Sequence, residues 1–204
     1  MRNYIDLNTI YTDHQFGEFK IISNIFDYGA SEKIKNRYNV TDEYKNFSNF
    51  YLFKNEDLIM CSTETELIRY SPFIKKSFGD VLLIGIGLGM VVFPFLDDPS
   101  ITSITIVDNE PELISYVGSK IKEKDIQNKV TILNGDGYEL YNDSSHFGKY
   151  DTVLLDFWIT ITKDTLDDVF NMKNNYLSFL KDENSIIMSW CEDIKDLLIE
   201  SFNP

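Results

Sequence analysis

Three glycines alternate with apolar residues directly after a hydrophobic run, and this arrangement suits a ligand held close to the backbone. The run is Val81–Ile84, and the glycines are Gly85, Gly87 and Gly89. Glycine lacks a Cβ, so the chain can turn tightly here and approach a bound molecule. The next segment can start a helix, whose free N–H groups and positive dipole end point at the same place. The motif alone leaves two interpretations open, ligand binding and a tight structural turn.

An acidic residue ends the next apolar segment, Ile104–Val107, about 20 residues beyond the glycine turn. At this spacing Asp108 is placed to hold a ribose, because a carboxylate offers only acceptors and a cis-diol presents two donors. We also assign the adjacent Asn109 to the predicted cofactor site. Asp108 or Asn109 can also cap a helix with Pro111 in its first turn, and both roles can hold at once because they use neighbouring residues. The spacing favours the ribose contact for Asp108.

A further acid lies between two glycines after the apolar segment Val130–Leu133. Gly135 and Gly137 flank Asp136, so its carboxylate can face a ligand edge and accept from an exocyclic amine. The alternative is an N-cap, a common role for aspartate before a helix.

The fourth candidate ends the buried-looking segment Thr152–Asp156. Asp156 is suited to accept a proton or orient a nucleophile. The two aromatic residues that follow, Phe157 and Trp158, can stack on a planar substrate or a cation. The alternative places both rings in the core, and this is the favoured interpretation for Phe157. We therefore predict Asp156 and Trp158 as the catalytic residues.

Strand and helix patterns alternate from Gly79 onward and predict the elements that position these residues. The predicted strands are 81–84, 104–107, 130–133, 152–156 and 185–190, and the predicted helices are 111–124, 164–180 and 192–202. Such alternation indicates an α/β fold with a doubly wound, mainly parallel sheet, here of five strands. Ligands bind at the carboxyl ends of the strands in such a sheet, and the glycine motif and the three acids all follow predicted strands at those ends.

The preceding residues predict a smaller mixed region. Its predicted elements are a strand within 16–25, a hairpin of 49–53 and 58–62, a helix from a capping box at 63–66 to residue 70, and a second helix from Ser71-Pro72 to Lys76. We expect two domains, a small N-terminal β/α region over 1–78 and a ligand-binding domain over 79–204.

Composition narrows the classes of function. The 204 residues are 43% hydrophobic and 14% aromatic, which is typical of a folded protein with one substantial core. The net charge of −14 argues against a nucleic-acid partner. No signal peptide and no membrane-spanning run is expected. Cys61 and Cys191 have no metal-ligand or disulfide spacing, so we expect no metal site and a cytoplasmic protein.

The motifs, taken in order, resemble those of the class I S-adenosylmethionine-dependent methyltransferases, most closely the spermidine-synthase-like branch. The similarity spans roughly residues 50–190 and rests on 82–89, 107–110, 135–137 and 150–156, with a hairpin strand and helix at 58–67. It implies a Rossmann-like fold with S-adenosyl-L-methionine as cofactor. The implied contacts are Gly85, Gly87 and Gly89 with the methionine part, Asp108 with the ribose, Asp136 with the adenine amine and Asp156 with the reacting centre.

The sequence also departs from that pattern. Polyamine synthases have a second acid shortly after the position of Asp156, a glutamine in the hairpin strand and a Tyr-His pair in the next helix. Here those places hold Phe157-Trp158-Ile159-Thr160, Met60 or Ile59, and Arg69-Tyr70. The prolines that follow the acid in many amino-group methyltransferases are absent as well, and we expect no sixth and seventh strand after residue 190.

The expected function is therefore methyl transfer to a small molecule or a protein side chain. A polyamine aminopropyltransferase-like enzyme and a non-catalytic adenosyl-binding module stay open as alternatives. A NAD-dependent dehydrogenase is disfavoured, because the glycines do not have the dinucleotide-binding spacing. A homodimer is left open as the assembly.

Overall fold

The structure is a computed structural model that describes residues 4–23, 29–38, 47–160 and 162–190. The chain forms two compact units, each built from several segments. The hairpin unit comprises Met1–Lys76, Ile86–Pro99 and Glu110–Val130, and the sheet unit comprises Ser77–Gly85, Ser100–Asn109 and Thr131–Pro204. These units interleave along the chain, so the contiguous division near residue 78 stays a prediction.

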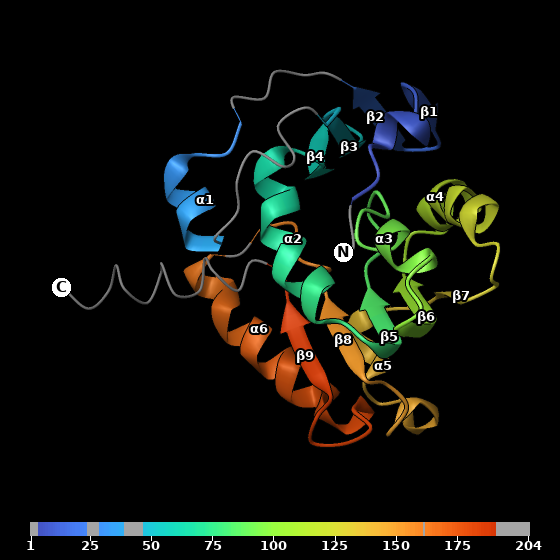
Figure 1. Cartoon of the computed structure of the whole chain (residues 1–204), viewed down its shortest axis with the longest axis vertical. Helices are drawn as coiled ribbons and strands as arrows, with labels where there is room; N and C mark the ends of the chain where they lie inside the picture. Colours follow the sequence, from blue (N-terminus) through green and yellow to red (C-terminus); the bar gives the residue numbers. More distant parts are fainter. Residues whose placement is uncertain (1–3, 24–28, 39–46, 161, 191–204) are drawn as a thin grey trace. The chain divides into compact units, whose positions relative to one another are not determined.

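The sheet unit contains a five-stranded sheet in the order β7-β6-β5-β8-β9 (Figure 1). The strands are β5 Gly79–Ile84, β6 Ile101–Asp108, β7 Val130–Asn134, β8 Thr152–Leu155 and β9 Ile186–Ser189. The pairings β5–β6, β5–β8 and β8–β9 are parallel. This order is that of a doubly wound sheet, and the predicted α/β, Rossmann-like fold is confirmed. The first strand of the sheet, β5, lies at its centre, where Val81–Ile84 are buried.

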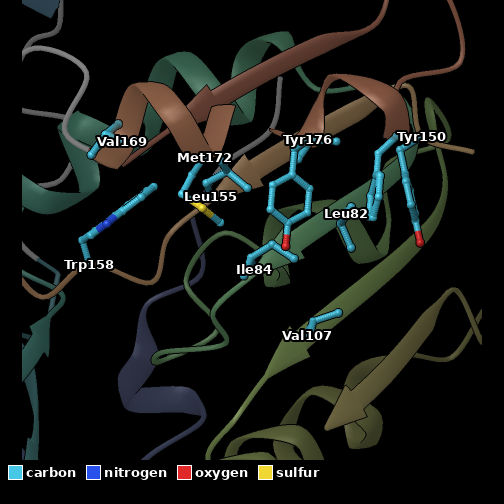
Figure 2. Close-up of a cluster of buried hydrophobic side chains, with 11 residues drawn as sticks. Leu82, Ile84, Val107, Tyr150, Leu155, Trp158, Val169, Met172 and Tyr176 are labelled. Atoms are coloured by element: carbon cyan, nitrogen blue, oxygen red, sulfur yellow. The ribbon is translucent and has the colours of Figure 1, made fainter. Parts of the chain in front are cut away.

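One hydrophobic core packs against this sheet and fixes the segments that follow β7 and β8 (Figure 2). These segments are α5 Gly137–Leu140, α6 Lys163–Asn175 and the 3-10 turn Tyr176–Phe179, and a further 3-10 turn, Ser144–His146, precedes β8. Helix α6 contributes Val169 and Met172, and the turn after it contributes Tyr176 and Phe179. The predicted helix 164–180 is therefore α6 followed by a tighter turn.

The hairpin unit contains an antiparallel sheet in the order β1-β2-β3-β4. Its elements are the 3-10 turn Leu7–Thr9, β1 His14–Phe16, β2 Phe19–Ser23, α1 Glu32–Tyr38, β3 Phe50–Lys54, β4 Asp57–Cys61, α2 Glu64–Lys76, α3 Phe93–Leu96 and α4 Pro111–Lys124. The hairpin β3–β4 agrees with the prediction. The strand predicted within 16–25 is confirmed as β2, and Gly17, with a φ of +54°, reverses the chain between β1 and β2.

The predicted break before Pro72 is wrong, because α2 is one continuous helix from Glu64 to Lys76. A proline inside a helix removes one backbone hydrogen bond and clashes with the preceding turn. Here burial of one helix face compensates for that loss, since Leu67, Phe73 and Ile74 are all at most 3% exposed.

Within the described residues, no helix combines the length and the apolar character needed to cross a bilayer. The same part of the chain contains no cluster of three or more His, Cys, Asp or Glu side chains suited to a metal ion. The predicted helix 192–202 and Cys191 lie outside the described residues.

Candidate functional site

A pocket of about 90 Å³ lies at the carboxyl ends of β5, β6 and β7, entirely within the sheet unit. Its lining consists of Ile84, Gly85, Val107, Asp108, Asn109, Gly135, Asp136, Gly137, Tyr138 and Phe157. Five of the predicted cofactor-binding residues are therefore brought together here: Gly85, Asp108, Asn109, Asp136 and Gly137. They meet because parallel strands end at the same edge of a sheet.

Gly85 forms the part of the pocket that follows β5 and adopts a φ of +100°, a conformation that suits glycine. Its N–H donates a 2.8 Å hydrogen bond to the carbonyl of Val107, and the N–H of Asp156 donates one of 2.8 Å to the carbonyl of Ile84. These bonds continue the pairing of β5 with β6 and β8 by one residue beyond the ends of β5 and β8. The glycine turn is thus fixed to its neighbours on both sides.

The half-buried Asp108 is the last residue of β6, and the alternative role as a helix cap is wrong. Helix α4 begins at Pro111, and Glu110 occupies the N-cap position without a side-chain capping bond. Proline in the first turn has no N–H that needs a partner. Asp108 and Asn109 therefore do not cap α4, and both residues line the pocket instead.

Asp136 has the N-cap role that the sequence left open for its position, and it also lies at the pocket. It is the N-cap of α5, and its Oδ1 accepts a 2.8 Å hydrogen bond from the N–H of Tyr138. The same residue is exposed and lines the pocket. The cap fixes the carboxylate next to the pocket, which is the arrangement that a contact with a ligand amine would need.

Gly137 is buried because other groups occupy the space that a side chain would need. A Cβ there would collide with the side chain of Ile84 and touch the ring of Phe157. Its carbonyl accepts a 2.7 Å hydrogen bond from the hydroxyl of Tyr176, a ring that Figure 2 shows with its oxygen directed toward Ile84. Burial, with smaller contributions from the charge of Asp136 and from Tyr141, raises the pKa of Tyr176, so this phenol stays a donor.

Two aromatic rings complete the pocket, and we refer to Tyr138 and Phe157 as the aromatic wall. Their ring centroids are 4.8 Å apart, with an edge-to-face interplanar angle of 75°. Sequence reasoning missed Tyr138 as a site residue and favoured a core position for Phe157. Their positions in the sequence could have identified both residues. Tyr138 lies two residues after Asp136, and Phe157 lies one residue after Asp156. Both acids follow predicted strands and were themselves predicted as site residues.

The residues predicted as catalytic have different surroundings. Asp156 follows β8 and is half-buried, and its backbone packs against Gly85. Trp158 is only 8% exposed, and its indole lies near Val169 and Met172 in the core shown in Figure 2. The indole Nε1 donates a 2.8 Å hydrogen bond to Asp168 Oδ2. Phe157, rather than Trp158, lines the pocket, and the catalytic roles of Asp156 and Trp158 stay predictions.

The other two glycines of the motif, Gly87 and Gly89, belong to the hairpin unit. Both have positive φ, +47° and +69°. The Met60 thioether occupies the space beside Gly87, and its Sδ accepts a 3.3 Å hydrogen bond from the N–H of Leu88. Met60 is one of the two positions, with Ile59, at which the resemblance implies a glutamine in polyamine synthases. The Tyr11 hydroxyl donates a 3.0 Å bond to the Leu88 carbonyl, so hairpin-unit side chains hold this turn.

Neither the family models nor the curated proteins contain a match to this chain. Among solved structures it is similar to a Methanobacterium thermoautotrophicum precorrin 8W decarboxylase, with 15% identity, a TM-score of 0.47, and 65% of this chain and 67% of that chain covered. It is also similar to Thermotoga maritima spermidine synthase, with 15% identity, a TM-score of 0.45, and 69% and 48% covered.

A Staphylococcus aureus protein assigned provisionally as a caffeoyl-CoA O-methyltransferase is similar at 18% identity and a TM-score of 0.44, with 60% of this chain and 55% of that chain covered. The chain therefore spans about half the length of this protein and of the spermidine synthase.

Proposed function

We propose that the chain binds S-adenosyl-L-methionine at the pocket of the sheet unit and transfers its methyl group to a small molecule or a protein side chain. The observation that carries the proposal is the meeting of two carboxylates, Asp108 and Asp136, in one pocket with Gly85 and Gly137. Carboxylates are pure acceptors, and a nucleoside presents donors at its ribose hydroxyls and its exocyclic amine. The glycines allow such a ligand to approach the backbone.

The residues fit the cofactor part by part. Asp108 and Asn109 would hold the ribose, and Asp136 would accept from the adenine amine. The aromatic wall offers a ring edge and a ring face to a planar base. The pocket volume of about 90 Å³ is smaller than the roughly 300–1,000 Å³ of a site that takes a whole drug-sized ligand. It therefore suits one moiety of the cofactor, and the other moieties would extend beyond these lining residues.

The chemistry needs little from the protein beyond placement. When bound, S-adenosylmethionine supplies an electrophilic methyl on a sulfonium. An acceptor nucleophile that is held in line with this methyl gains most of its rate from positioning. We assign Asp156 the role of taking up the proton that such a nucleophile loses. Its place after β8, next to Gly85, supports this role.

Calorimetric titration of the whole chain tests the binding step. We expect S-adenosylmethionine and S-adenosylhomocysteine to bind and NAD to show no heat of binding. Release of S-adenosylhomocysteine from a mixture of the protein, S-adenosylmethionine and cell extract then tests transfer. The proposal fails if neither adenosyl compound binds to the folded protein.

A non-catalytic adenosyl-binding module is the second candidate function. The position of Trp158 favours it, because the indole predicted to contact the substrate is buried and its N–H is bonded to Asp168. Cofactor binding without any release of S-adenosylhomocysteine above the enzyme-free control would favour this module over the methyltransferase.

A further inference from the structure

We infer that Asp168 is a positioning residue for the pocket, because its carboxylate connects the aromatic wall to helix α6. Asp168 is not among the residues that line the pocket. It acts through Tyr138 and Trp158, and the part of the inference that concerns ligand affinity rests on the proposed function.

A single oxygen of Asp168 makes both connections. Oδ2 accepts a 2.8 Å hydrogen bond from the Tyr138 hydroxyl and a 2.8 Å hydrogen bond from the Trp158 Nε1–H. Tyr138 belongs to α5, Trp158 to the segment after β8, and Asp168 to α6. Hydrogen bonds to a charged acceptor are stronger than neutral ones. The carboxylate therefore joins three separate segments of the sheet unit at one point.

Three aromatic rings contact one another in series, and the first and last of them both bond to this carboxylate. Tyr138 meets Phe157 edge to face, and Phe157 stacks on Trp158 with centroids 4.2 Å apart and an interplanar angle of 26°. The Tyr138 and Trp158 polar atoms then both bond to Asp168. Phe157, which lines the pocket, thus lies between two rings that α6 holds in place.

Of the three rings, Tyr138 most needs a partner that fixes its rotamer. Its side chain is 43% exposed, and packing alone leaves such a ring free to change rotamer. The bond to Asp168 selects the rotamer in which the ring lines the pocket. Preorganising a wall in this way improves affinity, because the bound ligand does not have to order it.

The electrostatic surroundings of the phenol agree with this geometry. Partial burial and then the hydrogen bond and charge of Asp168 raise the pKa of Tyr138 to about 12, while the Trp158 hydrogen bond lowers it. The charge of Asp136 acts in the same direction as that of Asp168. The phenol therefore remains a hydrogen-bond donor at any physiological pH.

The test compares Asp168→Ala and Asp168→Asn with Asp167→Ala, which removes the same charge from the exposed neighbouring residue of α6. We titrate each full-length variant with S-adenosylhomocysteine. The expected result is about a tenfold weaker Kd for Asp168→Ala, consistent with the loss of charge-assisted hydrogen bonds. We expect a smaller loss for Asp168→Asn, whose amide oxygen still accepts, and no change for Asp167→Ala.

A second measurement is independent of any ligand. Carbon-13 labelling of the tyrosine ring carbon that bears the hydroxyl gives one NMR signal per tyrosine, and the Tyr138 signal is the one that Tyr138→Phe removes. Asp168→Asn should lower the pKa of Tyr138. The signal of this carbon should therefore begin to shift below pH 10.5 as the phenol ionises, whereas the wild-type signal should not. Asp167→Ala should leave the titration unchanged.

The two readouts separate the possible failures. Unchanged Tyr138 ionisation in Asp168→Asn overturns the role of Asp168 whatever the ligand data show. Altered ionisation with unchanged S-adenosylhomocysteine affinity overturns the link between Asp168 and the pocket. If the wild-type protein binds no S-adenosylhomocysteine, the proposed function fails and the ligand part of the inference fails with it, while the NMR titration still decides whether Asp168 holds Tyr138.

Discussion

The backbone carbonyl oxygen of Asp156 lies against the α-carbon of Gly85, in the position that a side chain at residue 85 would occupy. Two strands that are neighbours in the sheet, β5 and β8, therefore come into contact immediately after both have ended. The same contact joins a residue of the pocket to the acid that we propose as the proton acceptor. The shape of the pocket and the location of Asp156 thus depend on one missing Cβ.

Gly85→Ala should lower the free energy of unfolding by about 3 kcal/mol or more, because it combines a strained φ with a collision against backbone. Gly148 provides a matched control, since it also has positive φ but no atom within 4 Å of a Cβ built there. Gly148→Ala should lower the free energy of unfolding only by the backbone strain of a positive φ, about 1–2 kcal/mol. Urea unfolding measures both variants, and equal losses would contradict the contact with Asp156.

Asp108→Ala should weaken the binding of S-adenosylhomocysteine by on the order of 1.5–3 kcal/mol for each charge-assisted hydrogen bond lost. The reason is that the ribose hydroxyls lose their acceptor at the end of β6. Calorimetry on the folded variant gives the affinity. Glu139→Ala removes an exposed charge from the neighbouring α5 and should bind normally. Unchanged affinity in Asp108→Ala would show that this residue does not hold the ribose.

Gly87→Val should abolish cofactor binding and leave the circular dichroism spectrum largely intact. A β-branched residue is strongly disfavoured at a φ of +47°, and its side chain would displace the Met60 thioether that bonds to the N–H of Leu88. Met60→Ala is the companion variant, because it removes the thioether and leaves the backbone of the turn unstrained. Normal binding by Gly87→Val would mean that the glycine serves only the turn.

Asp156→Asn should preserve cofactor affinity and slow methyl transfer by a factor on the order of 10²–10⁴, the usual contribution of a general base. The amide has nearly the same size but cannot take up a proton. The assay follows S-adenosylhomocysteine release with an acceptor found by screening cell extract. Release at the wild-type rate would remove Asp156 from the mechanism without affecting the binding proposal.

Stability should fall as the pH rises above about 10. Burial raises the pKa of Tyr11 and of Tyr176 above the ordinary value, so the folded protein keeps these protons after the unfolded chain has lost them. Between pH 10 and 11 each phenol should account for a loss of roughly 1 kcal/mol. Urea midpoints measured at pH 9, 10 and 11 test this. Tyr176→Phe should show a shallower decline, and a decline equal to that of wild type would exclude a contribution from Tyr176.

The sequence predicted the sheet well, because its signals are local. Each of the five strands is a short apolar run followed by a turn residue, and each was found within a few residues of the expected bounds. The topology of such a sheet brings the strand ends to one edge. That rule is sufficient to gather Asp108, Asp136 and Gly85 around one pocket without any knowledge of side-chain packing.

The features that were not predicted depend on contacts between segments far apart in the sequence. Pro72 suggested a helix break, but burial of the Leu67 and Phe73 face maintains α2 across it. Asp168 had the appearance of an ordinary acid in the first turns of a helix. Its pairing with Tyr138, 30 residues earlier, follows only from how α6 packs.

The central place of β5 also has a kinetic consequence. Val81 pairs with Ile104 on one side and with Thr152 on the other, so the second pairing closes a much longer stretch of chain. Loop-closure entropy makes that second pairing less favourable by about 1 kcal/mol before other contacts form. We therefore expect β5 and β6 to associate first during folding, with β8 and β9 joining afterwards. Core mutations in β6 should slow folding, whereas mutations in β9 should mainly speed unfolding.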